Sequence, residues 1–158
     1  FHEAEGNWFW WGREGAEPCK KLYRLMFDRF VNRHHLDNLI WVQNSPKPEN
    51  YPGDDVVDII SRDLYPPEHQ HTDLAKEYAE ILQVTSADKL AAVAEIGTIP
   101  DVPALTANNV PWCWFMTWSG GFTNSEKFTS FAELRRAYSC ENAVTLDKLP
   151  KLYNFNSK

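Results

Sequence analysis

The chain has 158 residues, of which 43% are hydrophobic and 14% aromatic, and this composition excludes an intrinsically disordered segment. The length fits one domain with a buried core. The net charge of −6, with no cluster of Lys and Arg on one element, argues against binding to a nucleic-acid backbone. The apolar runs are far shorter than a membrane span, so we expect no membrane-spanning segment.

Strand-like and helix-like segments alternate along the chain. Short apolar runs predict strands, and apolar residues at helical spacing predict helices. In chain order, we expect a strand ending at 1–3, a helix at 18–35, strands at 39–42 and 56–60, a helix at 73–84, a strand at 90–94, a short helix at 101–109, a strand at 111–118 and a helix at 128–137. Because Phe1 leads directly into His2 and Glu3, we also expect a missing segment upstream.

This alternation predicts an α/β fold built from parallel β–α–β units. The sequence has no Gly-rich phosphate turn of the kind that opens a doubly wound nucleotide-binding sheet. Polar, acidic or aromatic residues follow the expected strands, where the active sites of (β/α)8 barrels lie. These residues are Glu3, Asn44, Asp63 with Tyr65, Glu95 and Trp118. We therefore expect residues 1–158 to be a single catalytic domain that supplies about strands 4–8 of a TIM barrel, with strands 1–3 missing.

Two glutamates at strand ends suggest glycoside hydrolysis. A retaining glycosidase needs two carboxyl groups about 5–5.5 Å apart, one to protonate the leaving oxygen and one to attack the anomeric carbon. Glu3 and Glu95 each follow an apolar strand and precede a turn that contains glycine. Glu5 competes with Glu3 for the first role, and either carboxylate can instead be a surface group or a helix cap. Asp58 is either an interior or a surface group.

Residues 8–12, Trp-Phe-Trp-Trp-Gly, are the most unusual segment of the sequence. Four consecutive aromatic residues cannot all face one core, so we expect some to stack on sugar rings and others to pack beneath the loop. Trp118 is a second candidate platform for a sugar. Tyr65 either donates a hydrogen bond to a nucleophilic carboxylate or simply ends a strand. His2 points away from Glu3 if the strand persists, but can meet substrate if the chain turns there.

The cysteines and the other histidines predict no second chemistry. The three cysteines lack metal-site or disulfide-framework spacing, and Cys113, in an apolar run, is expected to be buried. None is a good nucleophile candidate. His69 and His71 lie in a Pro-rich loop without an acidic partner at metal spacing, so we expect both to be exposed. We predict no metal site.

Residues 1–12, FHEAEGNWFWWG, closely resemble the acid/base segment of glycoside hydrolase family 26, the β-mannanase family of clan A. Three further segments resemble the strand-six, nucleophile and strand-eight segments of that family, and all four come in the family's order. They are residues 51–58 with 63–65, residues 94–97 and residues 115–118. Ser61 and Arg62 depart from the pattern, because a small residue is expected before Asp63.

The resemblance implies a (β/α)8 barrel that hydrolyses β-1,4-mannans with retention and needs no cofactor. It implies Glu3 as the acid/base and Glu95 as the nucleophile. It also implies that His2, Trp8, Tyr65 and Trp118 line the subsite for the scissile sugar. The partner is then a β-mannan or manno-oligosaccharide, and activity requires the N-terminal half of the barrel. A polymeric substrate suggests a secreted, periplasmic or cell-surface protein.

Three alternatives remain at this stage. A relative in the same family can act on another polysaccharide, such as mixed-linkage β-glucan or xylan. A non-catalytic carbohydrate-binding fragment would use the tryptophans but has no need for two glutamates at strand ends. A structural half-barrel would need neither.

Overall fold

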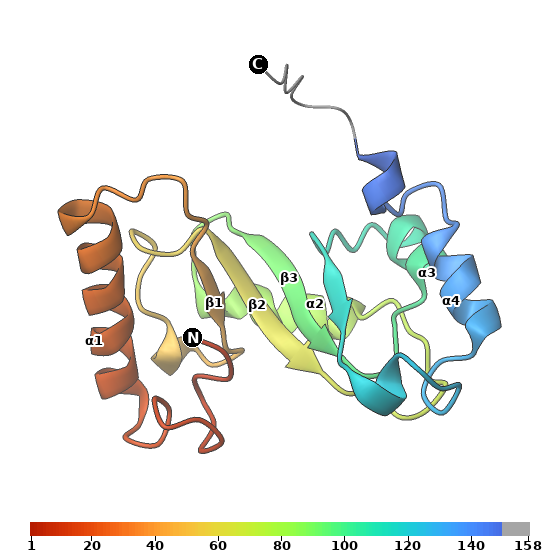
Figure 1. Cartoon of the computed structure of the whole chain (residues 1–158), viewed down its shortest axis with the longest axis horizontal. Helices are drawn as coiled ribbons and strands as arrows, with labels where there is room; N and C mark the ends of the chain where they lie inside the picture. Colours follow the sequence, from red (N-terminus) through yellow and green to blue (C-terminus); the bar gives the residue numbers. More distant parts are fainter. Residues whose placement is uncertain (150–158) are drawn as a thin grey trace, which may run out of the picture.

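The structure, a computed structural model, describes residues 1–149, so the end of the predicted domain lies outside the described residues. Its centre is a four-stranded parallel sheet in the order β1-β2-β3-β4. The strands are β1 (Val42–Asn44), β2 (Ile59–Leu64), β3 (Leu90–Ile96) and β4 (Phe115–Thr117). Figure 1 shows these strands side by side, with α1 beyond β1 and with α3 and α4 beyond β4. The α/β class predicted from the alternation is confirmed.

The helices follow the predicted order. They are α1 (Ala16–Phe27), α2 (Ala75–Ile81), α3 (Val102–Ala107) and α4 (Phe131–Tyr138). A π-helical turn, η1 (Asp28–Arg33), continues α1, and short 3-10 turns occur at η2 (Pro48–Asn50), η3 (Leu82–Val84), η4 (Gly120–Phe122) and η5 (Leu146–Lys148). Helix α2 lies in the crossover from β2 to β3 and α3 in the crossover from β3 to β4, as parallel strands require. No helix within residues 1–149 is long and apolar enough to cross a membrane.

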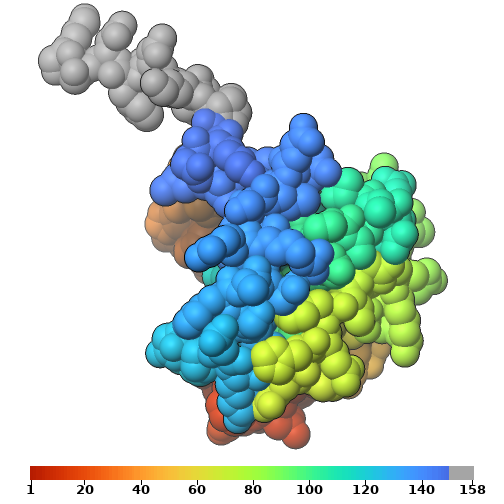
Figure 2. Space-filling view, turned by 90° about the vertical axis from the view of Figure 1, so that its right-hand side faces the viewer, coloured from red at the N-terminus to blue at the C-terminus, as the bar shows by residue number. Residues whose placement is uncertain are grey.

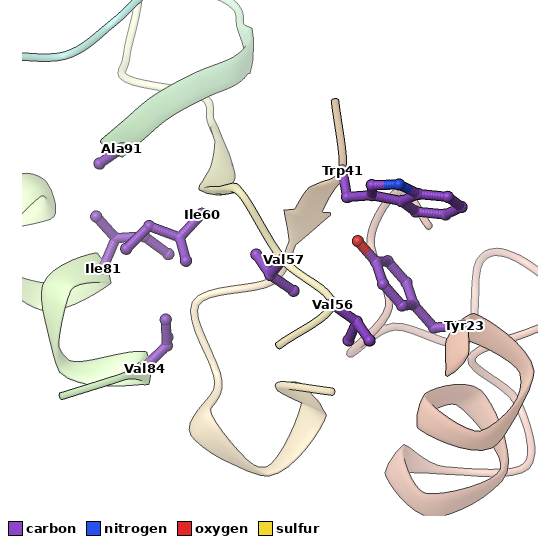
Figure 3. Packing of buried hydrophobic residues seen from close by; sticks show 8 residues of the cluster. All are labelled: Tyr23, Trp41, Val56, Val57, Ile60, Ile81, Val84 and Ala91. Carbon is purple, nitrogen blue, oxygen red and sulfur yellow. The ribbon is translucent and has the colours of Figure 1, made fainter. Parts of the chain in front are cut away.

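One face of the sheet packs against helices, and we call it the helix face. Ile60 of β2 and Ala91 of β3 meet Ile81 of α2 in the largest hydrophobic cluster, where Ile60 and Ile81 are fully buried. Figure 3 shows this cluster reaching from Ala91, past Ile60, to Tyr23 of α1. A second cluster joins Leu64, Leu74, Val93 and Ile96. This face supplies the apolar burial that stabilises the fold.

The C-terminal helices form a smaller cluster beside the sheet. Val102 of α3 and Ala137 of α4 pack against Ile99, and Arg136 forms an ion pair of 3.0 Å with Asp101. Figure 2 views this side, where α4 lies over α3 and over the chain that precedes α2. Two helices begin at capping side chains, because Asp101 accepts a hydrogen bond from the Ala104 N–H at the start of α3 and Ser130 accepts one from the Glu133 N–H at the start of α4.

The predicted strands differ from the observed ones mainly in where they begin. Residues 1–3 form a turn and not a strand, although the Ala4 N–H donates to the Asn44 carbonyl beside β1. The strand expected at 39–42 begins at Val42, and Ile40 is 71% exposed. The strand expected at 56–60 begins at Ile59, because Val56 and Val57 are buried in the irregular segment that precedes it. Burial alone makes such a segment look like a strand in the sequence.

Other differences are local. Strand β4 covers only 115–117 of the expected 111–118, and the chain before it lies beside β3, where the Cys113 N–H donates to the Ala91 carbonyl. Cys113 is therefore exposed, and the prediction that it is buried is wrong. The prediction that His71 is exposed is also wrong, since its Nδ1 lies 2.8 Å from the Ile99 carbonyl oxygen. His69 is exposed as expected.

Candidate active site

The face of the sheet opposite the helices opens into a cleft of about 730 Å³. Strands β1, β3 and β4 contribute to it, together with the N-terminal turn and the segments that follow β2 and β4. The lining residues are His2, Glu3, Trp8, Phe9, Val42, Tyr65, Ala94, Glu95, Trp114, Met116 and Trp118. All six site residues predicted from the sequence lie around this one cleft.

A β-bulge in β3 turns Glu95 toward the cleft. Arg62 of β2 pairs with Val93, but the next residue, Asp63, pairs with Glu95, so Ala94 has no partner. On the other side, Val93 pairs with Phe115 and Ile96 with Thr117, which again leaves one extra residue in β3. Both neighbouring strands therefore indicate one extra residue between Val93 and Ile96.

The bulge changes which face each side chain takes. In a regular strand, successive side chains point to opposite faces, so Glu95 would share the helix face with Val93. Instead, Ala94 and Glu95 both line the cleft, and Ile96 returns to the helix-face cluster with Val93. One extra residue thus allows a carboxylate in the cleft and a buried isoleucine directly after it.

A cluster of four polar side chains lies at the carboxyl ends of β1, β2 and β3. The Nε2 atom of His2 is 3.4 Å from Asp63 Oδ2 and 3.4 Å from Glu95 Oε2. The Asn44 amide donates to Asp63 Oδ1 at 2.8 Å, and the same nitrogen lies 3.3 Å from His2 Nδ1. Asn44 therefore orients both the carboxylate and the imidazole.

Burial and mutual repulsion affect both carboxylates of this cluster. Burial is the main cause that raises the pKa of Glu95, and the nearby Asp63 and Glu3 raise it further, while His2 acts in the opposite direction. Burial also raises the pKa of Asp63, against the lowering effects of Asn44 and His2. Glu95 thus keeps its proton to a higher pH than an ordinary glutamate, and His2 limits that rise.

The N-terminal turn brings Glu3 to the same cleft. Glu3 has φ of 46°, in the left-handed region, a conformation that costs a residue other than glycine about 1–3 kcal/mol and often occurs at functional sites. Because the chain turns here, His2 and Glu3 both line the cleft instead of pointing apart. Glu5, the competing acid, is half-buried and does not line the cleft.

The aromatic segment packs back on the turn that carries Glu3. Phe9 stacks on Trp11 with ring centroids 4.4 Å apart, and the Trp11 indole N–H donates to the His2 carbonyl at 2.8 Å. Gly12 is required here, since a Cβ at this position would collide with the Gly6 carbonyl oxygen. Two aromatic residues therefore support the turn, as expected.

The alternate aromatic residues face solvent. Trp8 is 79% exposed and lines the cleft, while Trp10 is 64% exposed outside it. Trp118, which follows β4, and Tyr65, which follows β2, are about half exposed and also line the cleft. A side chain at Gly97 would crowd the Tyr65 ring at 2.9 Å, so the glycine makes room for this ring.

Some site residues were missed or left without a role by sequence reasoning. Asn44 and Asp63 were noted only as polar residues at strand ends, although they form the cluster with His2. Trp114 and Met116 alternate with Trp118 along the cleft side of β4, a period-two pattern that the sequence does contain. The unusual Arg62 points to the helix face, where it pairs with Glu80 at 2.8 Å.

Comparison with known proteins places the chain in a family. The model of the family described as Glycosyl hydrolase family 26 matches residues 1–148. The chain belongs to glycosyl hydrolase family 26, and the resemblance seen in the sequence is confirmed.

Two of its relatives show how much of a longer protein the chain resembles. It is 41% identical over 148 residues to a mannan endo-1,4-beta-mannosidase of Thermothelomyces thermophilus, covering 94% of this chain and 30% of that protein. It is 40% identical, with a TM-score of 0.87, to the crystal structure of the Podospora anserina GH26-CBM35 beta-(1,4)-mannanase, covering 93% of this chain and 33% of that one. The chain thus spans about a third of these relatives.

A third similar structure carries a sugar ligand. The beta-mannanase from a symbiotic protist of the termite Reticulitermes speratus, complexed with gluco-manno-oligosaccharide, is 35% identical with a TM-score of 0.84. The match covers 94% of this chain and 46% of that chain.

Proposed function

We propose that the chain forms the catalytic part of a retaining mannan endo-1,4-β-mannosidase. The observation that carries this proposal is the convergence of Glu3 and Glu95 on one cleft, from a turn beside β1 and from the bulge of β3. The names of the relatives support mannan as the substrate. Two carboxyl groups facing one sugar site are the minimum that double displacement needs.

In the first step, Glu3 acts as the acid and Glu95 as the nucleophile. Glu3 gives its proton to the glycosidic oxygen as the bond from that oxygen to the anomeric carbon breaks. The Glu95 carboxylate bonds to the anomeric carbon and forms a glycosyl–enzyme ester. Glu95 must be ionised to attack, and the imidazole of His2, 3.4 Å from its carboxylate, favours that state.

In the second step, water resolves the intermediate. The Glu3 carboxylate takes a proton from a water molecule, and the water oxygen attacks the anomeric carbon. The bond to Glu95 breaks, and the sugar leaves with the configuration that it had at the start. Both glutamates return to their initial protonation states.

The aromatic residues of the cleft bind the sugar chain in this proposal. Trp8 and Trp118 are exposed platforms whose faces suit the C–H faces of pyranose rings. His2 and Tyr65 line the same subsite. The oligosaccharide complex of the similar protist enzyme supports a sugar ligand for this kind of cleft.

The chain supplies about strands 4–8 of a (β/α)8 barrel in this proposal. Its N-terminal turn stands where strand 4 ends, and β1 to β4 correspond to strands 5–8. Activity then requires the first half of the barrel, because β1 and β4 are the edges of the observed sheet. Since the substrate is a polymer, we place the enzyme outside the cytoplasm.

Loss of the nucleophile is the experiment that tests the proposal. Glu95→Ala, made in the protein expressed from its full coding sequence, should abolish release of reducing sugars from galactomannan and leave mannan binding intact. Glu141→Ala, at an exposed position away from the cleft, is the matched control and should retain activity. Hydrolysis that survives Glu95→Ala would refute the mechanism. Faster hydrolysis of mixed-linkage β-glucan or xylan than of mannan would refute the substrate.

A further inference from the structure

The cluster formed by His2, Asp63 and Glu95 also has spacing that could hold a metal ion. His2 Nε2, one oxygen of Asp63 and one oxygen of Glu95 all lie within 4.8 Å of one another. They come from three separate parts of the fold, namely the N-terminal turn, β2 and β3. The three ligand atoms are therefore close enough together to hold one metal ion.

The separations of these atoms match a tetrahedral metal ion. Zinc binds imidazole nitrogen and carboxylate oxygen at about 2.0–2.2 Å, so two ligand atoms of a tetrahedral site lie roughly 3.3–3.6 Å apart. His2 Nε2 is 3.4 Å from Asp63 Oδ2 and 3.4 Å from Glu95 Oε2. The third separation, between one oxygen of Asp63 and one oxygen of Glu95, is at most 4.8 Å.

Burial and charge favour a cation at this position. The side chains of Asp63 and Glu95 are only 9% and 6% exposed, and Asp63 Oδ2 has no hydrogen-bond partner among the described residues. Arg62, adjacent to Asp63, forms its ion pair with Glu80 on the helix face. Two buried carboxylates therefore face one imidazole, and a divalent ion would balance their charge.

Asn44 supplies the outer support that metal sites usually have. Its amide donates to the other oxygen of Asp63 and lies 3.3 Å from the other ring nitrogen of His2. Such contacts orient ligands and typically affect metal affinity by about 10–100-fold. One imidazole with two carboxylates suits zinc and similar transition-metal ions, whereas Ca²⁺ and Mg²⁺ prefer oxygen ligands in larger number.

We propose that His2, Asp63 and Glu95 bind Zn²⁺ or a similar transition-metal ion, and that the bound ion inhibits the enzyme. The ion engages the carboxylate of Glu95 and occupies the floor of the cleft, so sugar and metal exclude each other. The binding step stands on geometry alone, whereas the inhibition rests on the proposed mannanase function.

Calorimetric titration with ZnCl₂, in the protein expressed from its full coding sequence and without substrate, tests the binding step. We expect one bound ion per chain. Asp63→Asn and His2→Ala should remove this binding, and Asn44→Ala should weaken it about 10–100-fold. His34→Ala is the matched control, because His34 is exposed at the end of η1, and it should bind as the parent does.

The two ligand variants decide whether zinc binds at this cluster or elsewhere on the protein. Unchanged zinc affinity in correctly folded His2→Ala and Asp63→Asn proteins would overturn the proposal, as would the absence of saturable binding in the parent. Circular dichroism checks the fold of each variant. If a variant does not fold, cobalt replaces zinc in the parent, where a tetrahedral site gives visible absorption that one equivalent of Zn²⁺ should remove. Absence of that band would also overturn the proposal.

Kinetics with added zinc test the inhibition. Zn²⁺ should raise KM for mannan and leave kcat unchanged, and a chelator should reverse the effect. Inhibition that lowers kcat alone would contradict competition at this site. Zinc binding by a parent protein without mannanase activity would refute the proposed function and leave the metal site standing, so the two failures are distinguishable.

Discussion

The two faces of the sheet are made by the same strands yet differ in almost every physical respect. On the helix face, Ile60, Ala91 and Val93 are at most 1% exposed and pack against apolar side chains. On the cleft face, the neighbouring residues Asp63 and Glu95 are polar, buried and mutually repulsive. The helix face stabilises the fold, whereas the two buried carboxylates of the cleft face lower stability and supply groups for catalysis.

The bulge in β3 connects these two faces. It adds one residue between Val93 and Ile96, both of which stay in the helix-face cluster. The extra length is taken up on the other side, where Ala94 and Glu95 share the cleft. Substitutions on the helix face should therefore affect stability, and changes on the cleft face should affect turnover.

Of the changes that test the difference between the two faces, Ile60→Ala on the helix face should have the largest effect, and it should lower stability. Ile60 is fully buried against Ile81, so its truncation leaves a cavity and should lower the free energy of unfolding by about 2–5 kcal/mol. Urea unfolding measures this loss. At temperatures where the variant stays folded, kcat should match that of the parent. A large drop in kcat with unchanged stability would break the division between the faces.

Deletion of Ala94 should lower turnover strongly, by a free energy similar in size to the loss of stability expected for Ile60→Ala. The deletion makes β3 regular, so Glu95 stays opposite Asp63 and Ile96 opposite Leu64, but the strand loses the bend and extra twist of the bulge that aim the Glu95 carboxylate. Because misplacement by about 1 Å can cost about 100-fold, kcat/KM should fall by at least about 100-fold. Steady-state kinetics and a thermal melt check the result. Full activity after the deletion would show that the bulge does not position Glu95.

Asp63→Asn should produce the smallest effect of the three changes. It should raise stability, whereas Ile60→Ala lowers it. Burial raises the pKa of Asp63 above 3.8, so the folded state binds the proton more tightly than the unfolded state does. The stability from this group is present below the ordinary carboxyl pKa and is lost as pH rises through the raised value. The asparagine variant should therefore melt at a higher temperature than the parent near pH 7, with the gain vanishing below pH 3.8.

The control for Asp63→Asn is the same substitution at an exposed aspartate. Asp88→Asn, at an exposed position outside the cleft, should leave the melting temperature unchanged. A lower melting temperature of Asp63→Asn near pH 7 would mean that the contacts of Asp63 with Asn44 and His2 outweigh its burial. In that case, the cleft face would stabilise the fold.

The sequence predicted the order of the elements better than their limits. Apolar spacing predicted the helices, and the helices expected at 101–109 and 128–137 begin directly after the capping residues Asp101 and Ser130. Three of the strands begin later than predicted, whereas β3 begins at Leu90 as expected. Buried residues of irregular segments, such as Val56 and Val57, have the same apolar signature as a strand. The short turn at residues 1–3 depends on contacts with β1 that no local pattern reveals.

The site was predictable in its members but not in its geometry. Strand-end position and family resemblance singled out Glu3, Glu95 and four further residues, and these lie around one cleft, although their roles stay predictions. The bulge was not predictable, since an extra residue leaves no mark in the sequence until the register of both neighbouring strands is known. The cluster of Asn44 and Asp63 with His2 joins residues far apart in the sequence, so only the fold brings them together.

The most direct test of the proposed mechanism is to trap the sugar on its nucleophile. A 2-deoxy-2-fluoro-mannosyl donor with a good leaving group should label the protein expressed from its full coding sequence. Fluorine slows both steps, because both transition states resemble an oxocarbenium ion, but the good leaving group keeps the first step fast enough for the intermediate to accumulate. Mass spectrometry of the digested protein should then find one fluorinated sugar unit, on the peptide that contains Glu95. A label on Glu3, Glu5 or Asp63, or an active enzyme that is never labelled, would contradict the assignment of Glu95 as the nucleophile.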